Sequence, residues 1–366
     1  MDSLDLISTK NTENFILKKK DNKGQILLKC ITILLSMLLF SNIYSSYFIF
    51  DLNKKIRTMN MNYILSNTGN DIIQEYIETQ NNFCNNPSKF RNNQFEELIK
   101  LADFSFRNIS YKMYVYKNSD KYMSNEIIKT GKYEPEPMSN FLDALQYYGK
   151  KNNIIKNKDI FMLDIGGSLG VYPLFLGKFG YSILTFEASP RNSYILYKNY
   201  CLINRNSNII IINKGLSDEE KVCNYYSQIN GITNGMVLCD ENKEKIKSKK
   251  SYFNKTFEVK LTKLSKFFPY LLNKNIALIK LDIEGGEGKV IEDAIDLISK
   301  YHVPFIFSEF NPNYLKKHGT SPKKFLEIFV KNGYKISYKG FLNESYVTLE
   351  EVNHIENLYF IYDGKS

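Results

Sequence analysis

Four acidic residues each stand at the end of an apolar run in the sequence: Asp164 after FML, Glu187 after SILTF, Asp282 after IALIKL and Glu309 after PFIFS. Runs that are apolar throughout are typical of parallel strands buried on both faces. Any one of these acids could simply cap a helix or face solvent. Because ligands bind beyond the carboxyl ends of such strands, we expect the four carboxylates to converge on one edge of a sheet and form a site.

Asp164 opens the glycine-rich loop DIGGSLG, which contains Gly166, Gly167 and Gly170. A loop that binds a dinucleotide has the spacing G-x-G-x-x-G and places a helix N-terminus at the pyrophosphate. Here the spacing from Gly166 to Gly170 is G-x-x-x-G, and an acid stands at the entrance. A carboxylate there would repel a diphosphate and attract a cation. S-adenosylmethionine has no phosphate and carries a sulfonium and an ammonium group, so the loop favours this cofactor.

Glu187, at the end of the second strand, is placed to accept hydrogen bonds from both ribose hydroxyls of a nucleoside. The same acid would serve NAD, so Glu187 alone does not distinguish the two cofactors. The glycine loop does, and a NAD-dependent oxidoreductase remains the second enzymatic alternative.

The elements that must position these residues alternate regularly from residue 159. The sequence predicts strands over 159–164, 182–188, 208–214, 276–283, 303–310, 334–339 and 357–363, and helices over 171–179, 190–203, 261–272, 286–301 and 321–333. The stretch between 215 and 257 is lysine-rich and irregular. Helices between buried strands imply right-handed crossovers onto a parallel sheet, so we expect a doubly wound α/β domain.

These segments together resemble FkbM-type class I methyltransferases. The matching segments are LDIGGSLGVYPL, LTFEASP, NKGLSD, IKLDIEGGEGKVI, PFIFSEF and NGYKI, preceded by KTGKYEPE, and they cover residues 110 to 340 approximately. The chain departs from the family pattern at Ser168, where Asn is usual, and at Lys263, where Asp is frequent. The resemblance implies a Rossmann-like sheet with helices on both faces and S-adenosyl-L-methionine as cofactor.

The resemblance also implies roles for particular residues. The loop around the methionine part of the cofactor would comprise Asp164, Gly166, Gly167 and Gly170. Glu187 would accept the ribose, and Asp218 of GLSD would lie near the adenine. Around the end of the fourth strand, where the acceptor should meet the methyl group, the family pattern places Lys280, Asp282, Glu284 and Glu287.

The expected reaction is methyl transfer to a hydroxyl oxygen of a sugar or other natural product. A hydroxyl does not ionise at neutral pH, so the enzyme must align the reactants and remove a proton. We expect Asp282 near the cofactor and acceptor, and Glu284 or Glu309 as an orienting or basic group. We expect the side chains of Asp282 and Glu284 to point to opposite faces unless the strand has ended before them, so at most one of them should face the acceptor directly. His318 could be a base or a plain surface residue, and no metal site is predicted.

The N-terminal part of the chain predicts a membrane anchor. Residues 30–50 are uncharged and long enough to cross a bilayer as a helix, with the basic segment 1–29 before them. A mild excess of lysines before the segment favours a cytosolic N-terminus. A cleaved signal peptide and a buried helix are the alternatives. We expect a type II protein of the endoplasmic reticulum or Golgi, with a stem over 51–108 and a lumenal methyltransferase domain over 109–366.

Within the stem, FEELIKLADF has a helical pattern, and SYKMYVYK beyond it alternates like a strand. A lumenal domain would expose the sequons at Asn108, Asn254 and Asn343 to glycosylation. Outside the anchor there are four cysteines, which permit three pairings or none.

The formal net charge of +10 in 366 residues is spread along the chain. It indicates a solvated basic surface more than a nucleic-acid groove, so no nucleic-acid partner is expected. RNA methylation would moreover conflict with a lumenal domain. A lumenal protein that keeps the fold but only binds glycans or acts as a scaffold is the non-enzymatic alternative.

Overall fold

The computed structural model describes residues 71–364, except 119, 204, 206, 229–230 and 240–252. The predicted cytosolic segment 1–29, the anchor 30–50 and the first part of the stem lie outside the described residues. Among the helices that are described, none is both long and apolar enough to span a bilayer.

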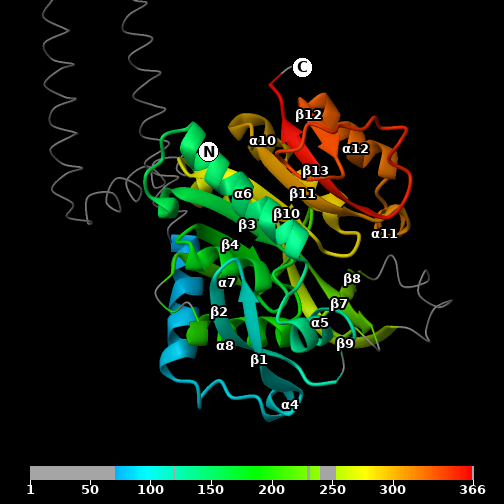
Figure 1. The fold of residues 1–366 in the computed structure, drawn as a ribbon. Helices are drawn as coiled ribbons and strands as arrows, with labels where there is room; N and C mark the ends of the chain where they lie inside the picture. The colour runs from blue at the N-terminus through cyan, green and yellow to red at the C-terminus, as the bar shows by residue number, and fades with distance from the viewer. Residues whose placement is uncertain are drawn as a thin grey trace, which may run out of the picture. The chain divides into compact units, whose positions relative to one another are not determined.

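A seven-stranded sheet forms the centre of the domain (Figure 1), with the strand order β12-β13-β11-β10-β3-β4-β5. Its strands are β3 (Ile160–Ile165), β4 (Ser182–Phe186), β5 (Ile209–Ile212), β10 (Asn275–Leu281), β11 (Phe305–Phe310), β12 (Tyr334–Ser337) and β13 (Glu356–Tyr362). The pairs from β11 through β10, β3 and β4 to β5 are parallel. The α/β prediction is therefore confirmed for this part of the sheet.

The sheet is mixed, so the predicted parallel arrangement holds for five of its strands and not for β12 and β13. Strand β13 pairs antiparallel with both β11 and β12. The cause is the connection from β12 to β13, which contains no helix and therefore does not make the crossover that a parallel strand needs.

Helices cover both faces of the sheet. Helices α6 (Pro135–Lys151), α7 (Val171–Lys178) and α8 (Pro190–Ile203) pack on one face, and α10 (Glu287–Tyr301) and α12 (Pro322–Lys331) on the other. Neighbours on β3 show the alternation: Met162 belongs to the first core and Leu163 to the second. Short helices α5 (Met123–Thr130), α9 (Phe268–Leu271) and α11 (Pro312–Lys317) and the turns η1 (Asn157–Asp159) and η3 (Leu264–Phe267) complete the connections.

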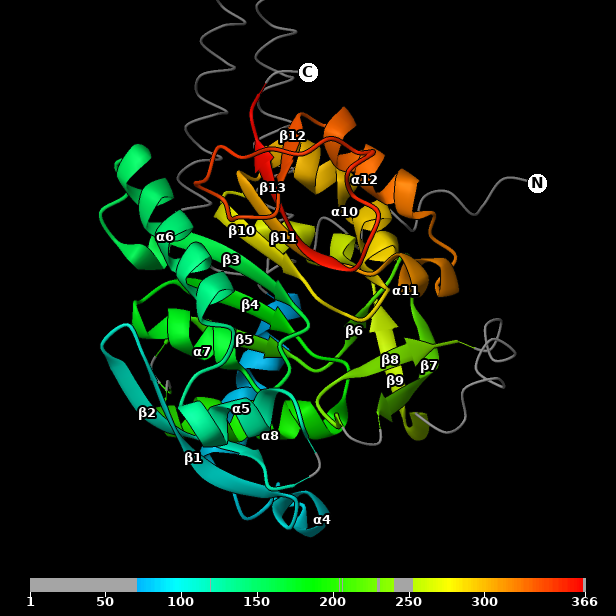
Figure 2. The same cartoon turned by 45° about the vertical axis from the view of Figure 1, so that its right-hand side comes forward.

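A second, four-stranded sheet lies beside the first (Figure 2), in the segment that the sequence left irregular. It contains β6 (Gly215–Leu216), β7 (Lys221–Gln228), β8 (Gly235–Leu238) and β9 (Phe253–Thr262), in the order β6-β9-β7-β8. The helix predicted over 261–272 was also wrong in part, because β9 extends to Thr262 and only the two short turns η3 and α9 follow.

The helix predicted in FEELIKLADF was wrong beyond its first turn. Helix α4 (Asn93–Glu96) is short, and the following residues form the hairpin of β1 (Ile99–Phe106) and β2 (Ile109–Tyr116). Pairing with β2, which the sequence did predict as a strand, outweighs the local helical pattern.

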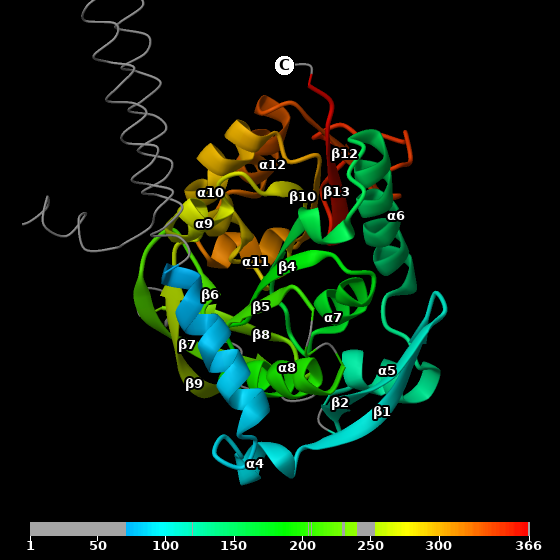
Figure 3. The same ribbon diagram turned by 90° about the vertical axis from the view of Figure 1, so that its left-hand side faces the viewer.

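Residues 71–85, expected as part of the stem, form a helix that lies along the β5 edge of the sheet (Figure 3). The Gln80 side chain donates to the carbonyl of Ile209 at 3.0 Å and accepts from the amide of Ile211 at 3.1 Å. A disulfide joins Cys84 to Cys201 at the end of α8. The edge strand is thus covered, which removes exposed pairing groups.

Candidate cofactor and acceptor site

A cavity of about 430 Å³ opens at the carboxyl ends of β3, β4, β10 and β11. The predicted residues that line it are Gly166, Glu187, Asp218, Asp282, Glu284 and Glu309. Three of the four strand-end acids, Glu187, Asp282 and Glu309, therefore meet at this cavity. Asp164, Gly167 and Gly170 do not line it.

The glycine loop is packed so closely that side chains are excluded. A Cβ on Gly166, at φ +97°, would lie 1.9 Å from the carbonyl oxygen of Asp282, and one on Gly167 would lie 2.2 Å from Oγ1 of Thr185. Ser168 also has a left-handed conformation, with φ 48°. Asn adopts that conformation more readily than Ser, so the departure from the family pattern falls on a position with a backbone requirement.

The amides of this loop bind the protein itself. Gly166 and Gly167 both donate to the carbonyl of Phe186 at 2.9 Å, and Ser168 donates to Oε2 of Glu187 at 2.8 Å. These groups are the ones that a pyrophosphate would need. Their internal use disfavours a dinucleotide and agrees with a cofactor without phosphate.

Glu187 follows β4 and is held rigidly at the cavity wall. Besides the amide of Ser168 at Oε2, the amide of Ser189 donates to Oε1 at 2.8 Å. Burial raises the pKa of Glu187 to about 7, although these two amides oppose the shift. Each oxygen keeps a further lone pair, so the carboxylate could accept the two hydroxyls of a ribose.

Asp164 was expected to meet the cofactor, and the structure places it elsewhere. It is fully buried, its Oδ2 accepts from Oγ1 of Thr185 at 2.7 Å, and its Oδ1 lies 3.7 Å from Nζ of Lys280. Burial raises the pKa of Asp164, and Lys280 and Thr185 oppose that shift. Asp164 is buried because it lies on β3, whose residues are all buried.

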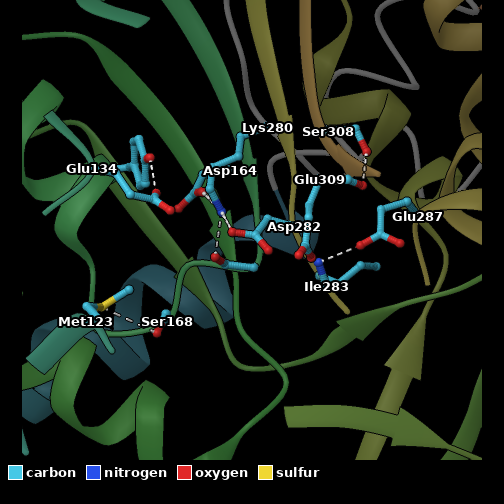
Figure 4. A network of polar contacts seen from close by, with 12 residues as sticks. Met123, Glu134, Asp164, Ser168, Lys280, Asp282, Ile283, Glu287, Ser308 and Glu309 are labelled. Atoms are coloured by element: carbon cyan, nitrogen blue, oxygen red, sulfur yellow. Dashed lines mark hydrogen bonds and ion pairs between the residues drawn. The ribbon is translucent and has the colours of Figure 1, made fainter. Parts of the chain in front are cut away.

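Lys280 on β10 links the loop to the cavity (Figure 4). Its Nζ donates to the carbonyl of Gly166 at 3.0 Å and lies 3.2 Å from Oδ2 of Asp282. Burial would lower the pKa of Lys280, but Asp282 and Asp164 outweigh burial and raise it. The lysine was predicted near the acceptor, yet it lies behind the wall as a buried cation.

Asp282 and Glu284 line the same cavity, so the expectation that only one of them faces it was wrong. The expectation was wrong because side chains two positions apart on a strand share a face rather than lying on opposite faces. Moreover, β10 ends earlier, at Leu281. Glu284 lies in the turn that follows, in a left-handed conformation with φ 60°, and Gly285 follows at φ 107°.

The remaining acids differ in their surroundings. Burial raises the pKa of Glu284 to about 8 and that of Glu309 to about 10, with Asp282 adding to both shifts. Glu287 does not line the cavity; its Oε1 accepts from the amide of Ile283 at 2.8 Å and so fixes the turn before α10.

Asp218, which does line the cavity, forms an ion pair with Lys289 at 3.0 Å. Burial by itself would raise the pKa of Asp218, but hydrogen bonds from Lys289 and Ser217 outweigh burial and lower it.

Other cavity residues were not selected from the sequence as site residues. Glu134 and Tyr133, from the segment KTGKYEPE before α6, line the wall with Met123, and His318, a possible base, lies there too. The similarity of KTGKYEPE to the corresponding family segment was the available signal for Glu134. No group of three or more metal-binding side chains occurs among the described residues.

An α/β sheet of this order, with a glycine loop and an acid that suits a ribose beyond its strands, is the framework of a nucleoside-cofactor enzyme. Residues 162–336 match the family model of the methyltransferase FkbM domain. Over these residues the chain is therefore similar to FkbM methyltransferases, as its sequence motifs indicated, and its cofactor is S-adenosylmethionine.

Several solved structures give matches at low identity and low TM-score. Precorrin-6Y C5,15-methyltransferase from Geobacter metallireducens GS-15 is 12% identical with a TM-score of 0.30, and the match covers 62% of this chain and 86% of that one. Magnesium protoporphyrin IX methyltransferase from Synechocystis PCC 6803 is 11% identical with a TM-score of 0.29, covering 62% and 84%. Monomeric WbdD is 9% identical with a TM-score of 0.36, covering 67% of this chain and 46% of that one. No protein of curated function gives a significant match.

The residues present fit the cofactor. The cavity volume lies in the range of small-molecule sites, which is roughly 300–1,000 Å³. Phe186, Leu216 and Ile283 supply apolar wall for a base, and the carboxylates suit a cationic methyl donor.

Proposed function

We propose that the protein is an O-methyltransferase whose acceptor is a hydroxyl group on a sugar or another small natural product. The observation that carries this proposal is one continuous cavity in which Glu187 stands at one part of the wall and Asp282, Glu284 and Glu309 at another. The first region suits a nucleoside, and the second suits an acceptor with several hydroxyls.

The bound cofactor supplies a methyl group on a positively charged sulfur. Asp282 presents negative charge to the cavity and is fixed by its ion pair with Lys280 at 3.2 Å. Glu309, with its pKa raised to about 10, and Glu284, with its pKa raised to about 8, hold their protons at neutral pH. Both therefore donate hydrogen bonds to acceptor oxygens and orient them.

A tritiated methyl donor added to a fractionated cell extract with the purified domain tests the reaction. We expect a small molecule or glycan to become labelled and an Asp282→Asn variant to lose at least about 100-fold in rate. Asp143→Asn is the control, since Asp143 is a partly exposed residue of α6 whose ion pair, among the described residues, is with Arg107. Label appearing in RNA or protein alone would contradict the proposal.

Two alternatives are tested by titration calorimetry. Binding of S-adenosylhomocysteine without binding of NAD supports the methyltransferase, and the opposite result supports an oxidoreductase. A scaffold protein that has kept only the fold would bind neither ligand, or would bind the first and label nothing.

We further propose that residues 30–50 anchor the chain in the membrane and that the domain lies in the lumen of the endoplasmic reticulum or Golgi. Two disulfides support this, Cys84 with Cys201 and Cys223 with Cys239. Disulfides persist in oxidising compartments and are rare in the cytosol.

Glycosylation tests the orientation. Asn343 is exposed in the loop between β12 and β13, and its Oδ1 accepts from the amide of Ser345 at 3.1 Å, while Asn108 is exposed at the tip of the β1–β2 hairpin. We expect peptide N-glycosidase to reduce the apparent mass of the full chain and Asn343→Gln to remove part of that change. A domain that stays accessible to protease outside intact microsomes would contradict the lumenal orientation.

A further inference from the structure

Glu134 has an unusual backbone conformation for its position. It precedes α6 as its N-cap residue with φ 40° and ψ 60°, and its side chain makes no capping hydrogen bond. The left-handed region costs a residue with a side chain about 1–2 kcal/mol. A glutamate that bears this cost and leaves the helix uncapped has its carboxylate directed elsewhere, here to the cavity wall.

The carboxylate of Glu134 is fixed by the helix that leaves the glycine loop. The Tyr172 hydroxyl, on α7, donates a hydrogen bond to Oε2 of Glu134. Tyr172 is buried, and Nζ of Lys280 lies 5.4 Å from the centre of its ring. Glu134 is therefore tied to the same loop and the same lysine that position Asp282, although it comes from a segment before the sheet begins.

Glu134 and Glu309 come toward Asp282 from opposite sides (Figure 4). The charged and titratable groups that face Glu134 come from five elements: Tyr133 beside it, Tyr172 of α7, Lys280 and Asp282 at the end of β10, Glu309 of β11 and Tyr359 of β13. Glu134 thus occupies the wall across from the acids that the sequence identified.

The other carboxylates are poorly suited to take a proton. Asp282 is ion-paired with Lys280 at 3.2 Å, and burial together with the charge of Asp282 raises the pKa of Glu284 to about 8 and that of Glu309 to about 10. Burial and Asp282 raise the pKa of Glu134, while the hydrogen bond from Tyr172 and the charge of Lys280 oppose the shift. Glu134 therefore combines a raised proton affinity with a hydrogen-bond donor and a nearby cation that stabilise its charged form, a combination that suits a general base.

We propose that Glu134 is the catalytic base that removes the acceptor proton, a role that rests on the methyl transfer proposed above. Its carboxylate takes the proton of the acceptor hydroxyl. The freed electron pair of the acceptor oxygen forms the bond to the methyl carbon, and the carbon–sulfur bond breaks with its electron pair going to sulfur. The products are the methyl ether, S-adenosylhomocysteine and protonated Glu134, which releases its proton to water.

The test compares Glu134→Gln with wild type in the tritium-labelling assay and in calorimetric titration with S-adenosylhomocysteine. We expect the rate to fall by about 100-fold or more, with the dissociation constant for S-adenosylhomocysteine changed by less than about threefold. Retention of more than about a tenth of the rate would overturn the role of Glu134. If the wild-type protein neither binds S-adenosylhomocysteine nor labels any acceptor, the proposed methyltransferase function is wrong, and the proposed role of Glu134 is then wrong as well.

Tyr172→Phe provides a second, independent measurement. Loss of its hydrogen bond destabilises the ionised form of Glu134, so the pKa of Glu134 rises. We expect the acidic limb of the pH–rate profile to move to higher pH while the rate at the plateau is largely kept. A purely structural role of Tyr172 would lower the whole profile without moving the limb. An unmoved limb would overturn the proposal even if Glu134→Gln failed to fold.

Discussion

The two regions of the cavity treat their carboxylates differently. At the loop region, Glu187 receives two amide hydrogen bonds, and Asp218 is paired with Lys289 and bonded to Ser217. At the acceptor region, no described residue donates a hydrogen bond to the carboxyl group of Glu284 or Glu309, and burial raises the pKa of both.

This difference indicates how fixed each ligand is. Carboxylates that already accept hydrogen bonds from the protein are held in a fixed position. Such preorganised groups suit a ligand whose shape does not vary. Buried polar groups left without partners in the protein gain them from the ligand. The loop region therefore suits the constant cofactor, and the acceptor region suits a molecule that brings its own hydroxyls.

The largest test of this comparison is Lys280→Met, because Lys280 joins the two regions. The substitution leaves Asp164 buried without its cation and the carbonyl of Gly166 without its donor. Removing one partner of a buried ion pair costs about 3–5 kcal/mol. Denaturant unfolding should show a loss of that size together with lost binding of S-adenosylhomocysteine.

Lys289→Met is the matched control. Lys289 is also paired with a cavity carboxylate, but its side chain is 32% exposed, against 2% for Lys280. A partly exposed pair contributes less than about 1 kcal/mol. Equal losses in the two variants would mean that Lys280 is not a special link between the regions.

The acids at the ends of the strands could be predicted because strand composition and the edge rule for parallel sheets are local and general. The contacts that each acid makes in the folded protein could not be predicted in this way. Asp164 is fully buried, and its cation Lys280 comes from more than a hundred positions later in the chain. Glu284 lies in a turn beyond Leu281, the last residue of β10, and strand ends are the least certain part of a pattern.

Other parts of the fold were missed for related reasons. The hairpin of β7 with β8 and β9 lies in a lysine-rich segment whose alternation is weak, and its pairing partners stabilise it. The Glu134 carboxylate depends on a left-handed backbone before Pro135 and on Tyr172 from a later helix. Neither feature is visible in a single short segment.

An intermediate loss of cofactor affinity is expected for Glu187→Gln, which changes a carboxylate of the loop region. The amide group keeps one acceptor oxygen and places an NH2 group against the amide of Ser168 or Ser189, each of which donates to the present carboxylate at 2.8 Å. An unsatisfied buried donor costs about 1–3 kcal/mol. Calorimetry should show at least about a tenfold weaker binding of S-adenosylhomocysteine, and unchanged affinity would remove Glu187 from the cofactor site.

The last test concerns pH, and it examines the acceptor region alone. The pKa of Glu309 is about 10 in the folded protein against an ordinary value of 4.5, and that of Glu284 is about 8. The folded chain therefore holds more protons than the unfolded chain above pH 4.5, so the free energy of unfolding falls as pH rises toward these values. Melting temperatures across this window should decline in wild type and decline less in Glu309→Gln, which cannot ionise. Since the substitution keeps the shape of the side chain, identical slopes in both proteins would mean that Glu309 ionises as freely in the fold as outside it.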